Sequence, residues 1–103
     1  MLESYTRGKT VTIKLDSGFN CKCFNNIKSI YSHAEPGSEF VLDLAKVSTI
    51  DCSSIGIMLV MREELPNSQN KIICTNCQPK VMEIFEFSNM VNLFNFPQAK
   101  NAA

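Results

Sequence analysis

The 103-residue chain has no tryptophan, a single histidine and no excess of charge of either sign. Ten basic residues balance ten acidic ones, and no run of lysine or arginine occurs. A protein that binds the phosphate backbone of a nucleic acid, or an anionic membrane surface, needs clustered positive charge. We therefore expect neither of these as the main partner.

Long apolar runs are also missing. The longest, residues 55–61, is far shorter than the ~20 residues of a membrane-spanning helix. The first ten residues, MLESYTRGKT, lack the apolar core of a signal peptide. The five cysteines, an odd number, then indicate reduced thiols rather than a disulfide framework. We expect a cytoplasmic protein with no membrane insertion.

The residues that could hold a metal or act as nucleophiles are poorly spaced. His33 has no matched partner in sequence, and Cys21 and Cys23 lie two apart on a predicted helix, where neighbours at that spacing point away from each other. No second CxxC accompanies Cys74 and Cys77, and no glycine-rich phosphate loop is present. We expect no metal and no cofactor. A small thiol oxidoreductase using these two thiols is the enzymatic alternative, although the 26 residues after Cys77 are too few for the rest of a thioredoxin-like fold.

The composition is that of a globular protein, with 45% apolar and 19% charged residues. A chain of this length makes one domain. We expect a single domain over residues 1–103, with an ordered core at about residues 10–96 and short polar termini.

Four segments have the pattern of strands. Thr10 to Leu15 alternates polar and apolar residues, as a half-buried strand does. Glu39 to Leu44 is a nearly continuous apolar run, which predicts a strand covered on both faces. Asn70 to Thr75 predicts a third buried strand, and residues 91–96, VNLFNF, predict a short last one.

Helices are predicted between these strands. Apolar residues recur at helical spacing from Phe24 to Tyr31, with Asn20 as a suitable N-cap. A second helix runs from about Ser53 to Leu65, and a third begins at Pro79. Alternation of strands and helices predicts an α/β sandwich in which helices pack on a mostly parallel sheet of four to five strands.

Polar residues gather where the second helix begins. Asp51, Cys52, Ser53 and Ser54 stand between a buried strand and an almost wholly apolar helix. In one interpretation Asp51 or Ser53 only caps the helix. In the other, Ser53 is phosphorylated, because the helix dipole and the free N–H groups of a helix N-terminus accept an anion. These residues alone leave both interpretations open.

Two longer segments carry a family resemblance. Residues 40–65, FVLDLAKVSTIDCSSIGIMLVMREEL, resemble the central motif of STAS domains, in which a strand ending in Asp-Leu precedes Asp-Ser-Ser-Gly/Ala-Leu-Gly at the start of a helix. Residues 72–96 resemble the end of that family, with a strand, Asn-Cys-x-Pro, a helix and a Leu-Phe pair. The resemblance covers about residues 10–96 and implies the fold of the bacterial anti-sigma factor antagonists.

The resemblance also implies a function. In those antagonists the second hydroxyl of the Asp-Ser-Ser triplet is phosphorylated, and Ser53 matches it. Cys52 replaces the first serine, and Ser54 stands at the Gly or Ala position as a rival acceptor. The acid usual at the first helix start is replaced by Asn20. The resemblance implies that the protein is not an enzyme. In this family the unphosphorylated form binds a serine kinase, often one that is itself an anti-sigma factor. The kinase phosphorylates the hydroxyl and so expels the antagonist, and a PP2C-type phosphatase resets the antagonist.

The second helix would then provide the partner surface. Methionine suits adaptable contacts, and Gly56 is expected to let the helix approach the sheet closely. The residues expected to bind the partner are Asp51, Cys52, Ser54, Ile55, Met58, Met61 and Arg62. The alternative is a constitutive STAS subunit of a larger assembly, such as a transport complex or a stressosome-like particle. The oligomeric state stays open between a monomer and a weak dimer.

Overall fold

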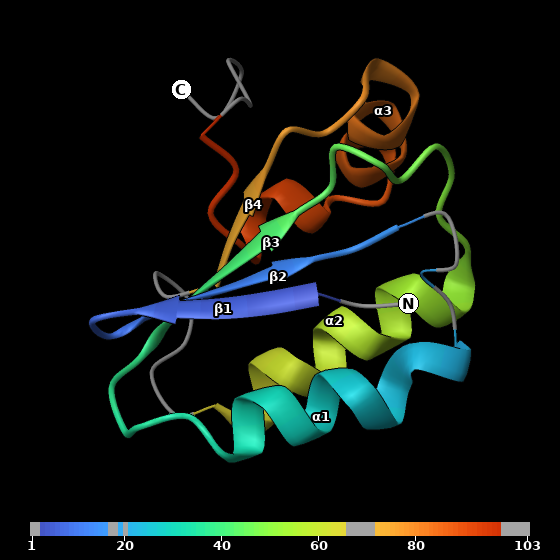
Figure 1. Ribbon diagram of the computed structural model, residues 1–103. Coiled ribbons are helices and arrows are strands. Elements are labelled where there is room, and N and C mark those ends of the chain that lie inside the picture. The colour runs from blue at the N-terminus through green and yellow to red at the C-terminus, as the bar shows by residue number, and fades with distance from the viewer. Residues whose placement is uncertain (1–2, 17–18, 20, 66–71, 98–103) are drawn as a thin grey trace.

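A four-stranded sheet forms the centre of the computed structural model, which describes residues 3–16, 19, 21–65 and 72–97 (Figure 1). Its strands lie in the order β1 (Glu3–Arg7), β2 (Thr10–Lys14), β3 (Glu39–Asp43) and β4 (Ile72–Thr75). β1 runs antiparallel to β2, whereas β2, β3 and β4 are parallel to one another. The predicted α/β architecture with a mostly parallel sheet is confirmed.

The strand β1 was not predicted, and it shows that the ordered part begins well before residue 10. Its sequence, ESYTR, has no buried side chain that would mark it as a strand. It exists because a two-residue turn at Gly8 and Lys9 folds it back onto β2. Gly8 has φ +63°, the left-handed value that the first central position of such a turn requires and that glycine adopts without strain.

The sheet is covered by helices on one face. Val11 and Ile13 of β2 and Phe40 and Leu42 of β3 are buried. In Figure 1, α1 and α2 lie side by side below the sheet. The alternate residues point the other way, and Val41 among them is only partly buried. The expectation that β3 is covered on both faces is therefore wrong.

The helical elements follow the predicted order. A 3-10 turn, η1 (Cys21–Cys23), leads into α1 (Phe24–Ser32); α2 spans Cys52–Glu64; and α3 spans Pro79–Phe87. The predicted N-cap Asn20 lies outside the described residues. The residue preceding α1 is Cys23, whose side chain makes no capping hydrogen bond.

The C-terminal segment forms less strand than predicted. A 3-10 turn, η2 (Met90–Asn92), is followed by one isolated bridge, between Asn95 and Ile73. The N–H of Cys74 donates to the carbonyl of Asn95 at 2.8 Å, and the N–H of Asn95 donates to the carbonyl of Ile72 at 3.0 Å.

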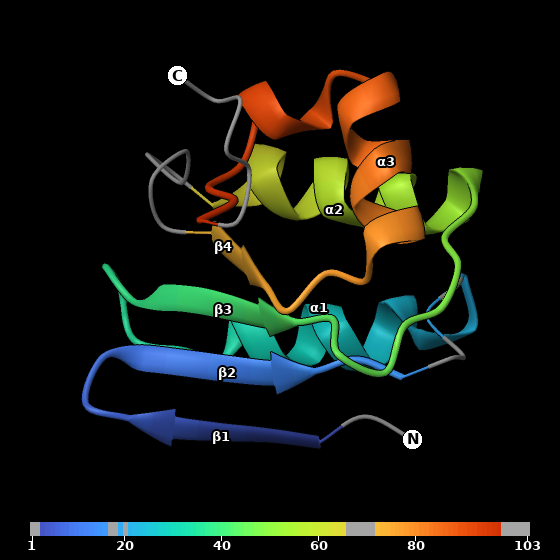
Figure 2. The same ribbon diagram turned by 90° about the horizontal axis from the view of Figure 1, so that it is seen from above.

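Aromatic packing holds this tail in place. Phe94 and Phe96 are buried, and the ring of Phe96 lies 4.9 Å from that of Phe85. The alternation that suggested a strand is thus produced by side chains that pack beside β4 rather than by a full ladder. Figure 2 shows α3, η2 and this tail at the edge of the sheet opposite β1. Within the described ranges, no helix has the length and hydropathy of a membrane span.

Candidate functional site at the start of α2

Buried side chains and backbone hydrogen bonds hold the loop between β3 and α2 in place. Leu44, Val47 and Ile50 are buried in the core. The N–H of Leu44 donates to the carbonyl of Thr75 at 2.9 Å, and the N–H of Val47 donates to the carbonyl of Leu44 at 3.0 Å. These contacts fix the path of the loop, so the residues that follow it are held in a defined position.

Side chains also tie this loop to the one between β4 and α3. One carboxylate oxygen of Asp43 accepts from the N–H of Ala45 and from the amide of Asn76, each at 3.1 Å. The amide of Gln78 donates to the carbonyl of Ala45 at 2.9 Å. The two loops meet because the ends of neighbouring parallel strands lie at the same edge of the sheet.

Asp51 is the N-cap of α2. Its backbone is extended, and its Oδ1 accepts from the N–H of Ser54 at 3.0 Å. The hydroxyl of Ser54 accepts in return from the N–H of Asp51 at 3.3 Å. This reciprocal pair is a capping box, which satisfies two backbone donors at the helix end. Of the two capping residues considered above, Asp51 performs the role.

Ser54 is fully buried, with 0% of its surface exposed. Its hydroxyl lies 2.7 Å from the carbonyl oxygen of Phe19 and 3.0 Å from Oδ1 of Asp51. A hydroxyl has one proton, and the shorter distance favours donation to Phe19. Ser54 thereby links the start of α2 to the segment before η1. It has no surface on which a partner could dock, so its expected place in the partner surface is wrong.

Ser53 lies one residue earlier and is half-buried, so part of its side chain reaches the surface. Its Oγ donates to Oδ1 of Asp51 at 2.7 Å. Asp51 is exposed, and this bond, followed by the one from the N–H of Ser54, lowers the pKa of its carboxyl group. The carboxylate is therefore ionised at neutral pH and holds the Ser53 hydroxyl in one orientation.

The faces of α2 differ from the expected ones. Ser54, Ile57, Met58 and Met61, at helical spacing, face the core. Met58 and Met61 are each only 1% exposed, so their predicted place in a docking surface is wrong. The opposite face carries an apolar strip that begins beside Ser53, and we call it the α2 outer strip: Cys52, Ile55, Gly56, Leu59 and Val60.

Leu59 and Val60 are the members of this strip that the sequence reasoning missed. They are 38% and 39% exposed. A helix with apolar residues around its circumference does not reveal its solvent face by hydropathy alone. The charged residue Glu63 was the available signal, because counting back from it by four and seven residues leads to Leu59 and Gly56.

Two other residues of α2 were singled out from the sequence, and only the role of Gly56 differs from the expected one. A Cβ atom built on Gly56 would meet nothing within 4 Å, so this glycine does not serve a close approach to the sheet. Arg62 is half-buried, and its Nε donates to the carbonyl of Leu93 at 3.0 Å. Arg62 lies nine residues after Ser53, roughly 13 Å along the helix, and it ties α2 to the C-terminal segment.

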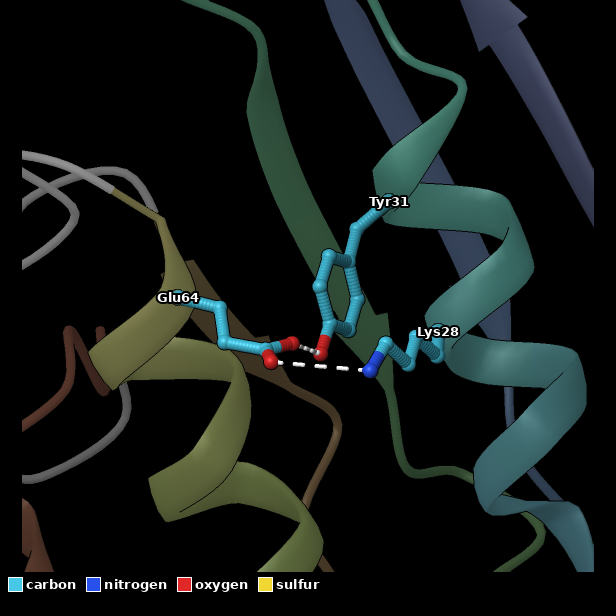
Figure 3. Close-up of polar contacts among 3 residues, drawn as sticks. All are labelled: Lys28, Tyr31 and Glu64. Carbon is cyan, nitrogen blue, oxygen red and sulfur yellow. Dashed lines mark hydrogen bonds and ion pairs between the residues drawn. The ribbon is translucent and has the colours of Figure 1, made fainter.

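A polar cluster joins the other end of α2 to α1. The hydroxyl of Tyr31 donates to one carboxylate oxygen of Glu64, and the ammonium of Lys28 lies 3.6 Å from the other (Figure 3). The ring of Tyr31 is buried, and this burial, together with the Glu64 carboxylate, raises the pKa of its hydroxyl. The cluster fixes α2 against α1 far from Ser53.

The thiol pair lacks the chemistry of a redox site. Cys74 and Cys77 are both buried. Burial raises the pKa of Cys77 to about 11 and also raises that of Cys74. Both thiols are protonated at neutral pH, whereas a redox-active cysteine needs its thiolate form.

His33 lies at the end of α1, where its Nδ1 is 2.7 Å from the carbonyl oxygen of Ser29.

Comparison with known proteins places this arrangement in a family. The family model of the STAS domain matches residues 2–103. The chain belongs to the STAS domain family. The start of α2, with its Asp51 capping box and half-buried Ser53, is thus part of a STAS domain.

Two curated STAS relatives show moderate identity. A STAS-domain-containing protein of Pseudomonas aeruginosa (strain UCBPP-PA14) is 27% identical over 88 residues, covering 84% of this chain and 87% of the relative. BtrV of Bordetella bronchiseptica (strain ATCC BAA-588 / NCTC 13252 / RB50), provisionally named an anti-sigma factor antagonist, is 27% identical over 63 residues. That match covers 61% of this chain and 54% of BtrV.

Solved structures of SpoIIAA share the fold. The unphosphorylated form of this anti-sigma factor antagonist superposes with a TM-score of 0.73 at 20% identity, over 99% of this chain and 92% of SpoIIAA. The phosphorylated form of the Bacillus protein gives a TM-score of 0.67 at 19% identity, over 99% of this chain and 96% of that one. Both matches show that this chain shares the fold of SpoIIAA.

Proposed function

We propose that this STAS domain is a phosphorylation-controlled anti-sigma factor antagonist of a cytoplasmic partner-switching pathway. With Ser53 unphosphorylated, the start of α2 and the α2 outer strip bind a serine kinase that is itself an anti-sigma factor. The kinase transfers a phosphoryl group to the Ser53 oxygen, the complex dissociates, and a PP2C-type phosphatase removes the phosphate. In this cycle the domain itself catalyses nothing.

The contrast between two adjacent hydroxyls carries the proposal. Ser54 is buried and bonded to the main chain, whereas Ser53 reaches the surface on the first turn of α2. A kinase must reach the oxygen that it phosphorylates, so the rival acceptor Ser54 is inaccessible in the folded protein. Asp51 holds the Ser53 hydroxyl at 2.7 Å and so presents it in a fixed orientation.

The electrostatics of the site explain how a phosphate would act. Phosphorylation replaces the Ser53 proton, so the hydrogen bond to Asp51 is lost and a group of roughly −1.5 to −2 charge lies beside an ionised carboxylate. The positive end of the helix dipole offsets part of this charge, and the fold survives. A partner that buries the apolar outer strip would have to desolvate that charge without a counter-ion.

The free energy needed to release the partner is small. A tenfold loss of affinity corresponds to about 1.4 kcal/mol, and desolvating an unpaired charge costs several times that amount. Within the outer strip, Cys52 directly precedes Ser53 and Gly56 lies three residues after it, one turn along the helix, so a partner seated on the strip lies within reach of its phosphate. The names of BtrV and SpoIIAA, and the existence of a phosphorylated SpoIIAA, support the same assignment by family likeness.

The test is affinity capture of partners from cells of the source organism, read by mass spectrometry. Wild type and Ser53→Ala should retain a protein with a serine kinase domain, and Ser53→Asp should lose it by at least about tenfold. Ser48→Asp is the matched control, because Ser48 is exposed in the same loop and adds the same charge five residues away. It should bind as the wild type does.

Two results would contradict the proposal. One is full binding by Ser53→Asp together with a Ser53 that is never phosphorylated in cells. That outcome would favour the alternative, in which the outer strip is a constitutive docking face of a STAS subunit in a larger assembly. The other is equal loss of binding in Ser48→Asp, which would make the effect one of general charge rather than of the Ser53 position.

A further inference from the structure

One edge of the sheet is covered by another segment of the described chain, and the other edge is open. The edge at β4 is covered by the C-terminal segment, whose Asn95 bonds to the backbone of Ile72 and Cys74. The edge at β1 has no neighbouring strand within the described part of the chain, and all five residues from Glu3 to Arg7 are exposed. Figure 2 shows β1 running alone along this side of the molecule. An open edge presents backbone donors and acceptors to another strand.

The hairpin determines which backbone groups face outward. Arg7 and Thr10 close the two-residue turn, so they form a hydrogen-bonded pair with each other. Hydrogen-bonded and non-bonded pairs alternate along an antiparallel ladder. Glu3, Tyr5 and Arg7 therefore direct their N–H and C=O groups to β2. The corresponding groups of Ser4 and Thr6 point to the open edge.

The side chains of β1 are complementary to those of a second, antiparallel copy of the same strand. When a second β1 is aligned antiparallel about Tyr5, Glu3 of one copy lies opposite Arg7 of the other, Ser4 lies opposite Thr6, and the two Tyr5 rings lie opposite each other. Opposite charges, hydroxyl pairs and aromatic pairs are the cross-strand combinations that stabilise a sheet. Every pair in this alignment is one of the three.

The alternation of outward-facing and inward-facing backbone groups along β1 fits the same alignment. When the alignment is centred on Tyr5, Ser4 of each copy forms a hydrogen-bonded pair with Thr6 of the other. The two residues of such a pair are joined by two backbone hydrogen bonds. Those are the residues whose donors and acceptors face outward. The Tyr5 pair is then of the non-bonded kind, in which opposed side chains lie closest. Tyr5 is half-exposed in the single chain, with the ammonium of Lys14 5.9 Å from its ring centre, so its ring is available on that face.

We propose that β1 is a self-association edge, through which two copies of this chain join by antiparallel β1–β1 pairing into one continuous sheet. Glu3 and Arg7 set the register, because a shift of two residues in either direction separates them from their opposite charges. The interface is one short strand per copy, so the dimer is weak. It is expected at protein concentrations on the order of 0.1–1 mM, as for other small interfaces.

The test is a charge exchange followed by sedimentation equilibrium of the full chain. Glu3→Arg and Arg7→Glu, each alone, place like charges opposite each other at both ends of the pairing. Each should raise the dimer dissociation constant by roughly tenfold or more. An equimolar mixture of the two variants should associate as the wild type does, because a chain with two arginines then meets a chain with two glutamates. The variant carrying both changes should also associate.

Two further variants complete the test. Thr6→Pro removes an outward N–H without changing charge, and proline is tolerated at such an edge position; it should abolish association. Phe87→Ser removes the large, almost fully exposed ring at the end of α3 and should leave association unchanged. Far-UV circular dichroism verifies that each variant folds. A wild type that stays monomeric, a mixture that fails to associate, or a dimer lost in Phe87→Ser would each overturn the proposal.

Discussion

At the scale of single residues, Ser53 and Ser54 show how one backbone step changes the role of a hydroxyl. Both follow the same N-cap, and both hydroxyls contact Oδ1 of Asp51. Ser54 occupies the third helical position, which points back into the protein toward the carbonyl of Phe19. Ser53 occupies the second, which points to the surface. Ser54 is part of the buried structure, and Ser53 is the hydroxyl that the proposed kinase can reach.

The two serines should therefore respond differently to removal of the hydroxyl. Ser54→Ala removes the partner of the buried carbonyl of Phe19 and of the partly buried N–H of Asp51, so the free energy of unfolding should fall by about 1–3 kcal/mol. Ser53→Ala removes one surface bond, and its effect should stay within about 0.5 kcal/mol. Urea denaturation at neutral pH measures both. Equal losses, or the larger loss in Ser53→Ala, would contradict this assignment.

At the scale of elements, α2 combines a buried face, an exposed apolar strip and a glycine between its first turns. Gly56 is on the exposed side, and no side chain in the described structure needs the space that its missing Cβ leaves. A glycine inside a helix costs stability relative to alanine, because it loses more backbone freedom on folding. Its presence beside Ser53 is thus explained by the proposed docking surface better than by the fold.

Gly56→Ala should accordingly stabilise the protein. We expect the free energy of unfolding to rise by about 0.5–1 kcal/mol, because the helical backbone accepts alanine and its Cβ meets no atom. Gly8→Ala is the matched control: its Cβ also meets no atom, but its φ of +63° strains any residue with a Cβ, so stability should fall. Thermal unfolding compares the two. A destabilised Gly56→Ala would show that this glycine has a packing role after all.

At the scale of the whole molecule, the proposed switch and the proposed self-association edge lie apart. Figure 2 shows β1 at one edge of the sheet and the first turn of α2 well away from it, toward the side of α3. The two proposals also use different forces: the first depends on a phosphate next to an apolar strip, and the second on backbone pairing with a fixed charge register. Changes at well-separated sites with no shared contacts act independently.

This separation predicts that each function survives loss of the other. Glu3→Arg, which should weaken the dimer, is expected to capture the kinase partner within about threefold of wild type. Ser53→Asp, which should lose the partner, is expected to keep the dimer dissociation constant of the wild type. Capture experiments and sedimentation on the same preparations measure both. If one variant lost both properties, the two surfaces would be coupled.

Much of the fold follows from local patterns. The alternation in Thr10 to Leu15, the apolar run that became β3, and the proline at the start of α3 each predict their element within about two residues. The motif at Asp51 likewise indicates where α2 begins, because an acid followed by serines fits the N-cap and third helical positions. These features depend on residues close in sequence, so the sequence displays them directly.

By itself, then, the sequence indicated the alternation of β2, β3 and β4 with the helices and, through the family resemblance, Ser53 as the hydroxyl of interest. Only the tertiary structure decided that Met58 and Met61 face the core while Leu59 and Val60 face solvent, because an apolar helix takes its orientation from the elements it packs against. The same holds for β1, whose polar residues become a strand only when β2 supplies hydrogen-bond partners. It holds also for the C-terminal segment, whose place beside β4 depends on the buried ring of Phe85.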